Sequence, residues 1–314
     1  MKTRIVLFSL IAVLAASCAS SAPFMRGAAA RPLFSSVETA VPVWESLETG
    51  GKEDGGEAAL AIFAGKIAGP KMEFWAVRAD LSSPKIRIVV GAGETQEGSG
   101  GDDGTGTGTV PSTFVSGFVR RNALAAGINA TPFDPSSARE GEARRIVGLA
   151  GSEGVMTAPP RPPYDAAVFY ADGTGAVVSQ ADAPDSRETG KKIMHAAGGF
   201  YAVLADGKPL ERTRRTDARY PRSAAGFSRD GRILYLLVID GRRAGSRGAT
   251  EAETALLLRS LGASSGINLD GGGSSAMAVR GKDGTVRIVN VPVHGGIPGR
   301  ERGVAVCIGI GENP

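Results

Sequence analysis

Four Asp-Gly pairs, each lying between two apolar runs, constrain the fold of this chain most strongly. The pairs begin at Asp172, Asp206, Asp230 and Asp283. Asp-Gly accommodates the left-handed backbone of a two-residue β-turn, so each pair predicts a hairpin. The 314 residues include 45 glycines and 18 prolines but only 6% aromatics, a composition typical of short strands joined by tight turns. We predict an α+β fold in one domain, with a mixed, mostly antiparallel twisted sheet and a few packed helices.

Three apolar segments give the clearest strand predictions. Residues 72–81 and 84–91 are strand-like, and the Ser82-Ser83-Pro84 corner between them predicts a hairpin. Residues 233–239 are continuously apolar, which favours a central strand covered on both faces.

Two helices are expected among these strands. Ser112 is placed to cap a helix over residues 113–122. Thr250 and Glu253 have the Thr-x-x-Glu spacing of a capping box, and Gly262 stands where that second helix would end.

The first residues have the parts of a secretory signal. Lys2 and Arg4 precede an apolar run over residues 5–16, which is shorter than the roughly 20 residues that a membrane-spanning helix needs. Cys18 follows small residues, as in a bacterial lipobox. We predict a signal peptide over 1–17, lipidation of Cys18 and an exported, envelope-anchored protein, with an ordinary secretory signal as the alternative. Residues 18–69 are expected to form a tether and a loosely structured lead-in.

Cysteine content and charge exclude several classes of function. Cys307 is the only other cysteine and lies in an apolar run, so neither a disulfide framework nor a cysteine metal site is expected. Two histidines are too few for a typical zinc site, and we predict no metal and no cofactor. The formal net charge of +4 falls to about +2 without Lys2 and Arg4, which is too small for a nucleic-acid surface.

The segment 267–275 is the most informative candidate site. An apolar strand runs into Asp270, three glycines and two hydroxyl residues, Ser274 and Ser275. Consecutive glycines are costly to order, so this turn predicts a need for bare backbone. A turn of this kind can aim several N–H groups at one anion and hold the carboxylate beside it. A tight structural hairpin is the alternative, whereas P-loop and EF-hand patterns are absent.

A serine hydrolase is disfavoured by the same segment. Ser274 lacks the Gly-x-Ser-x-Gly elbow, because Ala276 stands two residues after it. The two histidines, His195 and His294, lie at loop-like positions. Carboxylates therefore remain as the candidate acid, base or nucleophile.

Several blocks in a fixed order resemble the phosphodiester glycosidase family. The similarity is strongest over about residues 210–310, and it reaches back more weakly through residues 197–200 and 127–129 to the strands near Phe74. The blocks are Tyr220 to Gly226, Asp230-Gly231, Ile239 to Arg242, Gly248-Ala249-Thr250 with Glu253, Asn268 to Ser275, and Glu301-Arg302. The resemblance implies a catalytic domain over residues 70–314. It also implies cleavage of the C1–O bond of a sugar-1-phosphodiester of the N-acetylglucosamine type.

The resemblance also implies roles for individual residues. Asp270 is the first choice for the carboxylate at C1. Glu253 matches a family acid, although the capping box alone explains it. Arg222 and Arg302 would stabilise the departing phosphate, which carries its own charge and needs cationic donors. The implied substrate-binding set is Asn129, Asp240, Asn268, Gly271, Gly272, Gly273, Ser274 and Ser275.

Two departures from the family pattern bear on the sugar. Residues 130–133 read Ala-Thr-Pro-Phe where the family has glycine and paired aromatics, and Ala276 replaces a threonine. Two other functions stay open at this point. One is a non-catalytic envelope lipoprotein that binds phosphate-containing glycans, and the other is a phosphodiesterase that cleaves P–O. The oligomeric state stays open as well.

Overall fold

The computed structural model describes residues 43–49, 58–91, 108–183, 190–215 and 218–313. The predicted signal peptide and Cys18 lie outside these residues. Every strand ladder among the described residues is antiparallel, and the strands form four sheets.

The largest sheet has eight strands in the order β1-β2-β3-β17-β16-β18-β14-β15. Its centre is the apolar strand β17, which pairs with β3 on one side and β16 on the other. The strands are β1 (Val43–Thr49), β2 (Leu60–Ile67), β3 (Met72–Asp80), β14 (Tyr201–Ala205), β15 (Lys208–Pro209), β16 (Arg222–Phe227), β17 (Ile233–Ile239) and β18 (Ser265–Asn268).

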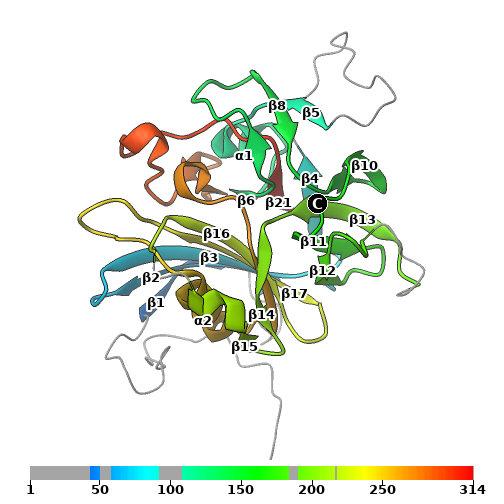
Figure 1. The fold of residues 1–314 in the computed structure, drawn as a ribbon, viewed down its shortest axis with the longest axis horizontal. Helices are drawn as coiled ribbons and strands as arrows, with labels where there is room; N and C mark the ends of the chain where they lie inside the picture. Colours follow the sequence, from blue (N-terminus) through cyan, green and yellow to red (C-terminus); the bar gives the residue numbers. More distant parts are fainter. Residues whose placement is uncertain (1–42, 50–57, 92–107, 184–189, 216–217, 314) are drawn as a thin grey trace, which may run out of the picture.

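A second sheet, in the order β20-β19-β6-β21-β4, lies above the first in Figure 1. Its strands are β4 (Ile86–Gly91), β6 (Ala126–Asn129), β19 (Met277–Arg280), β20 (Val286–Ile288) and β21 (Cys307–Glu312).

Two smaller sheets complete the fold. One has the order β10-β9-β13-β11-β12 and the other β5-β8-β7. Their strands are β5 (Thr109–Pro111), β7 (Phe133–Asp134), β8 (Ala143–Ile146), β9 (Ala150–Ser152), β10 (Val155–Ala158), β11 (Asp165–Tyr170), β12 (Gly175–Ser179) and β13 (Ile193–Gly198).

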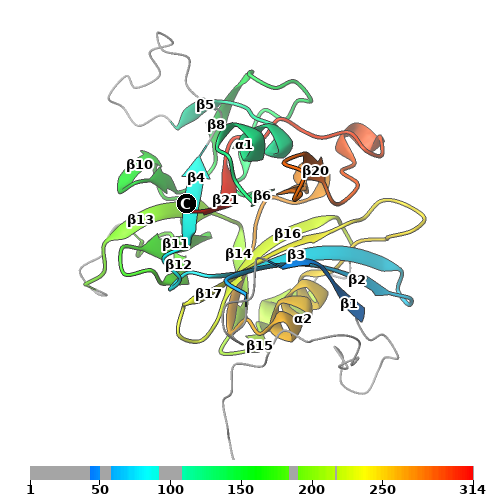
Figure 2. The same cartoon turned by 180° about the vertical axis from the view of Figure 1, so that it is seen from behind.

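Helices cover the outer faces of the two main sheets, as Figure 2 shows from behind. The helix α2 (Glu251–Leu261) packs Leu257 and Leu261 against the eight-stranded sheet. The helix α1 (Val115–Arg121) packs Phe118 against β19 and β21 of the second sheet. The largest core cluster lies between the sheets, where Leu236 and Ile308 belong to the same group of buried residues. The order of layers is therefore helix, sheet, sheet, helix.

The predictions of the Asp-Gly hairpins and of the two ends of the second helix are confirmed. The four Asp-Gly pairs join β11 to β12, β14 to β15, β16 to β17 and β19 to β20, and each joined pair is antiparallel. The capping box is present with both of its hydrogen bonds. Gly262 ends α2 with a left-handed φ of 109°.

Other expectations differ from the structure. The predicted hairpin over 72–91 does not form, because β3 pairs with β2 and β17 whereas β4 pairs with β21 in the other sheet. Ser112 does not cap α1, whose N-cap residue is Phe114. The fold begins before residue 70, because the predominantly buried β2 pairs along the length of β3. With two α-helices in the described residues, the single domain is largely β within the predicted α+β class.

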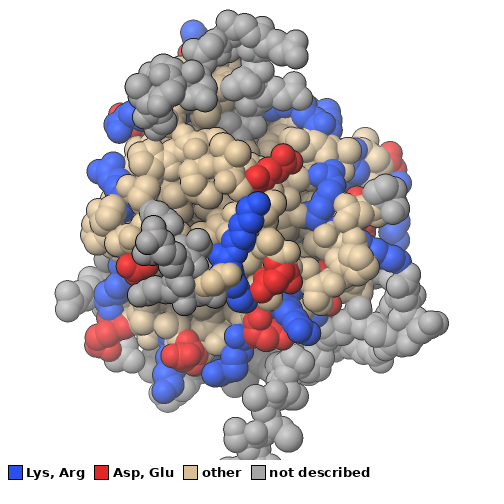
Figure 3. Space-filling view, turned by 90° about the vertical axis from the view of Figure 1, so that its right-hand side faces the viewer, with Lys and Arg blue, Asp and Glu red and all other residues tan. Residues whose placement is uncertain are grey.

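The surface carries charges of both signs. On the face drawn in Figure 3, basic side chains alternate with acidic ones, and no patch of one sign spans that face. No helix within the described ranges has the length and apolarity to cross a membrane.

Candidate active site

The glycine turn links the two main sheets. The chain leaves the eight-stranded sheet at the end of β18, passes through Asp270 and the 3-10 turn η2 (Gly272–Ser274), and enters the second sheet as β19. Backbone hydrogen bonds hold this crossing. The Asp270 N–H donates to the carbonyl of Ala130 over 2.8 Å, and the Gly272 N–H donates to the carbonyl of Pro221 over 2.8 Å. The position of Asp270 is thus set by both layers.

The three glycines are needed because three groups approach the turn. A Cβ on Gly271 would lie 3.0 Å from the Pro221 carbonyl oxygen. Gly272 has a left-handed φ of +63°, and a Cβ there would lie 3.1 Å from Nη2 of Arg242. A Cβ on Gly273 would lie under 3.0 Å from Nη2 of Arg302, closer than real Cβ atoms approach other atoms. The guanidinium groups of Arg242 and Arg302 therefore pack directly against the backbone of Gly272 and Gly273.

Asp270 is a partly buried carboxylate with few partners. It accepts hydrogen bonds from the Ser274 hydroxyl and from the Gly271 N–H, and Arg302 acts on it through its charge. Burial outweighs these contacts and raises the pKa of Asp270 to about 6. The side chain is accordingly ionised at neutral pH and takes up a proton in mild acid.

Arg302 is held on the other side of Ser274. Its Nη1 donates to the Ser274 Oγ over 3.1 Å, and its Nε donates to Nδ1 of His294 over 2.8 Å. The preceding Glu301 accepts from the N–H and hydroxyl of Ser116, at 3.1 and 2.8 Å, at the start of α1. Glu301 therefore binds the start of α1, and the neighbouring Arg302 contacts the glycine turn.

Arg222 borders the turn from β16. Its side chain is 10% exposed, and its Cδ would lie 4.0 Å from a Cβ on Gly271. Nε donates to the Ala249 carbonyl over 3.1 Å, and Nη1 lies 3.9 Å from a carboxylate oxygen of Glu251. The ring of Tyr220 stands 5.5 Å from the guanidinium carbon.

Sequence reasoning missed Arg242 as a site residue. It lies just beyond β17 with a left-handed φ of 57°, an uncommon conformation for a residue with a side chain, and its guanidinium lies 5.8 Å from the Tyr220 ring. No carboxylate pairs with it among the residues that the structure describes. The Asp-Gly-Arg block contained this residue, but only the fold brings it to Gly272.

Glu251 was also missed. It is the first residue of α2, its side chain is 18% exposed, and it faces Arg222. By contrast, both carboxylate oxygens of Glu253 are occupied. Arg219 donates to them over 2.6 and 3.1 Å, and the Thr250 N–H donates over 2.8 Å. The structure therefore places Glu253 in the helix cap, where Arg219 and Thr250 occupy its carboxylate.

Asn129 braces the turn from within. Its side chain is fully buried and its Nδ2 donates to the Asp270 carbonyl over 2.6 Å, while its Oδ1 accepts from the Ser223 hydroxyl over 2.6 Å. Asn268 and Ser275 are buried too, and Oδ1 of the former and Oγ of the latter have no partner among the described residues.

Asp240 is the second internal brace. It is 1% exposed, and its carboxylate accepts from the Val291 N–H at 2.9 Å, from Nδ2 of Asn290 at 3.2 Å and from Nε of Arg243 at 3.0 Å. Asn290 also donates to the Ser275 carbonyl over 3.0 Å. Asp240 thus fixes the start of the Arg242 loop relative to the turn, and burial raises its pKa.

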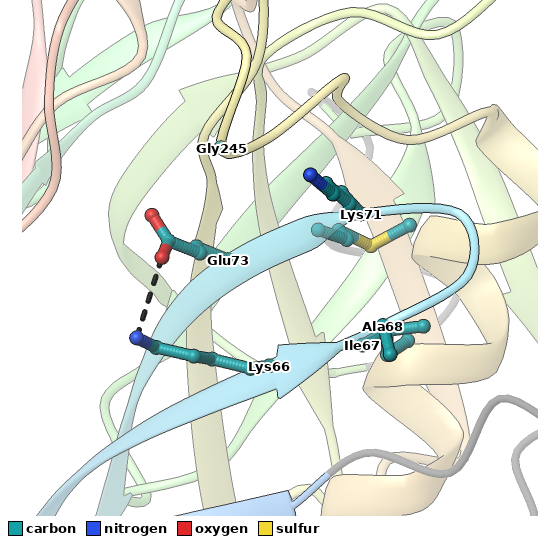
Figure 4. Close-up of a pocket in the computed structure, with 7 residues that line it drawn as sticks. Lys66, Ile67, Ala68, Lys71, Glu73 and Gly245 are labelled. Carbon is teal, nitrogen blue, oxygen red and sulfur yellow. Dashed lines mark ion pairs between the residues drawn. The ribbon is translucent and has the colours of Figure 1, made fainter.

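A cavity of about 350 Å³ lies elsewhere, beside the β2–β3 hairpin. Figure 4 shows Lys66 and Glu73 facing each other on these strands, with Gly245 above them. This ion pair spans 3.4 Å, and no residue of the glycine turn lines the cavity. We therefore place the candidate chemistry at the turn. Across the described residues, no cluster of three or more His, Cys, Asp or Glu side chains is arranged to hold a metal ion.

Comparison with solved structures shows the same fold in three proteins. The catalytic domain of zebrafish N-acetylglucosamine-1-phosphodiester alpha-N-acetylglucosaminidase, auto-inhibited by its pro-peptide, matches with a TM-score of 0.58 at 18% identity, over 86% of this chain and 88% of that one. A hypothetical protein from Synechocystis has a TM-score of 0.53 at 14% identity, over 79% and 62% of the two chains. A putative exported protein from Burkholderia pseudomallei K96243 has a TM-score of 0.50 at 16% identity, over 77% and 74%.

Sequence comparison is more specific. The SPbeta prophage-derived uncharacterized protein YomE of Bacillus subtilis (strain 168) is 30% identical over 189 residues, which is 56% of this chain and 27% of that protein. The match thus spans about a quarter of the length of this relative. A profile of the phosphodiester glycosidase family matches residues 122–311, which include Asn129, Arg222, Asp270 and Arg302. Because this match covers more than half of the chain, the chain belongs to the phosphodiester glycosidase family of hydrolases.

Proposed function

We propose that the protein hydrolyses the glycosidic C1–O bond of a sugar-1-phosphodiester. The observation that carries this proposal is the pairing of one carboxylate with one guanidinium across Ser274. Asp270 accepts a hydrogen bond from the Ser274 hydroxyl, which in turn accepts from Arg302. An acid for the sugar carbon and a cation for the phosphate therefore meet at one turn.

The phosphate side of the reaction needs cationic donors. When the C1–O bond breaks, the leaving phosphate monoester keeps the bridging oxygen and gains negative charge. Arg302 and Arg242 rest on adjacent glycines, and Arg222 borders the turn. Permanently charged guanidinium groups stabilise this charge without a strong general acid, because a phosphate monoester is itself a good leaving group.

The sugar side of the reaction needs a carboxylate. One water is consumed, and its oxygen ends on C1 of the sugar. Asp270 either attacks C1 to form a glycosyl-enzyme ester that water then opens, or accepts a proton from the attacking water. Both routes need the ionised carboxylate, which predominates above a pKa of about 6. Ser274 orients that carboxylate in either case.

The substrate and location are part of the same proposal. An N-acetylglucosamine-type sugar agrees with the name of the zebrafish enzyme, whose fold this chain shares. The residues ahead of Cys18 have the pattern of a lipoprotein signal. We therefore place the enzyme on the cell envelope through a lipid on Cys18, acting on an envelope or extracellular glycan.

The direct test is release of free sugar from a synthetic N-acetylglucosamine-1-phosphodiester. Asp270→Asn should lower kcat at least about a hundredfold, because an amide neither attacks C1 nor accepts a proton. Asp172→Asn is the matched control, since Asp172 also precedes a glycine at the end of a strand but lies in the β11–β12 turn. Equal activity of the native protein and the Asp270 variant would reject the proposed role.

A further inference from the structure

His294 is the second protein group that holds Arg302. It begins the 3-10 turn η3 (His294–Gly296), where it is partly buried, and its Nδ1 accepts the hydrogen bond from Arg302 Nε at 2.8 Å. Ser274 occupies Nη1. Within the described ranges no carboxylate forms an ion pair with Arg302. The hydrogen bonds that direct this guanidinium therefore come from two neutral partners, and Asp270 adds an attraction through its charge.

The loop between the two residues is closed on itself. Val293 forms a β-bridge with Arg300, and the His294 N–H donates to the Arg300 carbonyl over 3.1 Å. Gly295 and Gly296 take left-handed φ values of 62° and 77°, which let the chain turn back. The imidazole and the guanidinium thus face each other across a short closed loop whose backbone fixes their separation.

The hydrogen bond defines the protonation state of the imidazole. An arginine side chain only donates, so Nδ1 of His294 must be unprotonated and the proton of the neutral ring must be on Nε2. The charged groups that act on His294 are Arg302 and Arg300, and burial together with these two cations lowers its pKa. Arg302 in turn faces Arg242 and Arg144 as well as Asp270. Adding a proton to Nδ1 would place it against the N–H that Arg302 donates and near the two positive charges of Arg302 and Arg300.

We propose that neutral His294 is a positioning residue for Arg302, and that its protonation releases Arg302 from the glycine turn and lowers the activity. The inference rests on the proposed function, because it assigns Arg302 to the leaving phosphate. It adds a second acid-sensitive group beside Asp270. The site then requires two deprotonated groups, and the rate should fall with the square of the proton concentration on the acid side.

Three variants test the role of His294 in turnover. His294→Leu removes the acceptor and should lower kcat about 10- to 100-fold, by analogy with the loss of a hydrogen-bond partner that orients a metal ligand. His294→Gln keeps an acceptor oxygen that does not titrate and should recover most of that loss. His195→Gln is the matched control, because that histidine lies on β13 and contacts Ser152.

The pH profile separates positioning from general stability. In native protein the logarithm of kcat/KM should rise on the acid limb with a limiting slope of 2, whereas His294→Gln should show a slope of 1. A slope of 1 in the native protein, or full activity in His294→Leu, would overturn the proposal. Destabilisation alone would not change the slope at temperatures where every variant is folded.

A titration that needs no substrate keeps this inference distinct from the proposed function. Nitrogen-15 NMR should show Nδ1 of His294 unprotonated at pH 7.5, and Arg302→Gln should raise the midpoint of the His294 titration because a neighbouring cation is gone. A protonated Nδ1 or an unmoved midpoint overturns the pairing. If the native protein hydrolyses no sugar-1-phosphodiester while the NMR results hold, the proposed function fails and the pairing stands.

Discussion

Asp270→Asn should make the protein more stable at neutral pH while it removes activity. The carboxyl has an ordinary pKa of 3.8 when unfolded and a pKa of about 6 when folded, because folding buries it. Between these values the folded protein holds a proton that the unfolded chain has released. The free energy of unfolding therefore falls as the pH rises through this window. A rise of about two units at about 1.4 kcal/mol per unit corresponds to roughly 3 kcal/mol above pH 6.

An asparagine has no such cost because it does not ionise. We expect Asp270→Asn to be about 2 to 3 kcal/mol more stable than the native protein at pH 7.5, and about equal to it at pH 4. For a domain of this size the gain corresponds to about 5 to 10 °C in Tm. Thermal unfolding of both proteins at the two pH values measures it.

Asp172 provides a control for which the opposite change in stability is expected at neutral pH. Contacts with Thr174 and Lys191 lower the pKa of Asp172 to about 2, so its ionised form stabilises the fold at pH values above 3.8. Asp172→Asn should therefore lose stability at pH 7.5. If the stability of Asp270→Asn relative to the native protein is the same at pH 4 and at pH 7.5, ionised Asp270 does not destabilise the fold. Burial of the Asp270 carboxylate in the turn is then refuted.

Three further single substitutions test the site and the predicted anchor. Arg222→Lys keeps the charge but loses the planar fork, so kcat should fall about 10- to 1000-fold in the sugar-release assay. Gly273→Ala should displace Arg302 and lower kcat with the fold intact by circular dichroism. Gly245→Ala should have no effect, because its new Cβ would make only ordinary contacts, with Nη1 of Arg243 at 3.5 Å and Oε2 of Glu73 at 3.9 Å. Cys18→Ser should move the protein from the membrane fraction to the soluble fraction without loss of activity.

The fold was predictable from sequence where the signal is local. An Asp-Gly turn or the Thr250–Glu253 capping box depends on residues within a few positions of one another, and these predictions are confirmed. The hairpin over 72–91 failed because strand pairing is a long-range choice. Leu81 donates its N–H to the Arg232 carbonyl, and the chain then crosses to the second sheet. Nothing near residue 81 carries that information.

In the candidate site too, local features could be predicted from the sequence and long-range contacts could not. The glycines mark the turn in the sequence, and Asp270 and Arg302 meet there. The sequence could not reveal that Arg242 rests on Gly272, since 29 residues and α2 separate them. The sequence suggests His294 as a zinc ligand or as the partner of a catalytic serine, whereas its observed partner is an arginine. Glu253 remains a candidate through its match to a family acid, and the same spacing forms the helix cap that is observed.

Hydrolysis in water enriched in oxygen-18 tests the central claim most directly. Native protein is incubated with an N-acetylglucosamine-1-phosphodiester under single-turnover conditions, and both products are analysed at once by mass spectrometry. Cleavage of C1–O places the heavy oxygen on the sugar and leaves the phosphate monoester unlabelled, and this is the result that the account predicts. Heavy oxygen in the phosphate would show that P–O is cleaved, and would contradict the assignment of Asp270 to the sugar carbon.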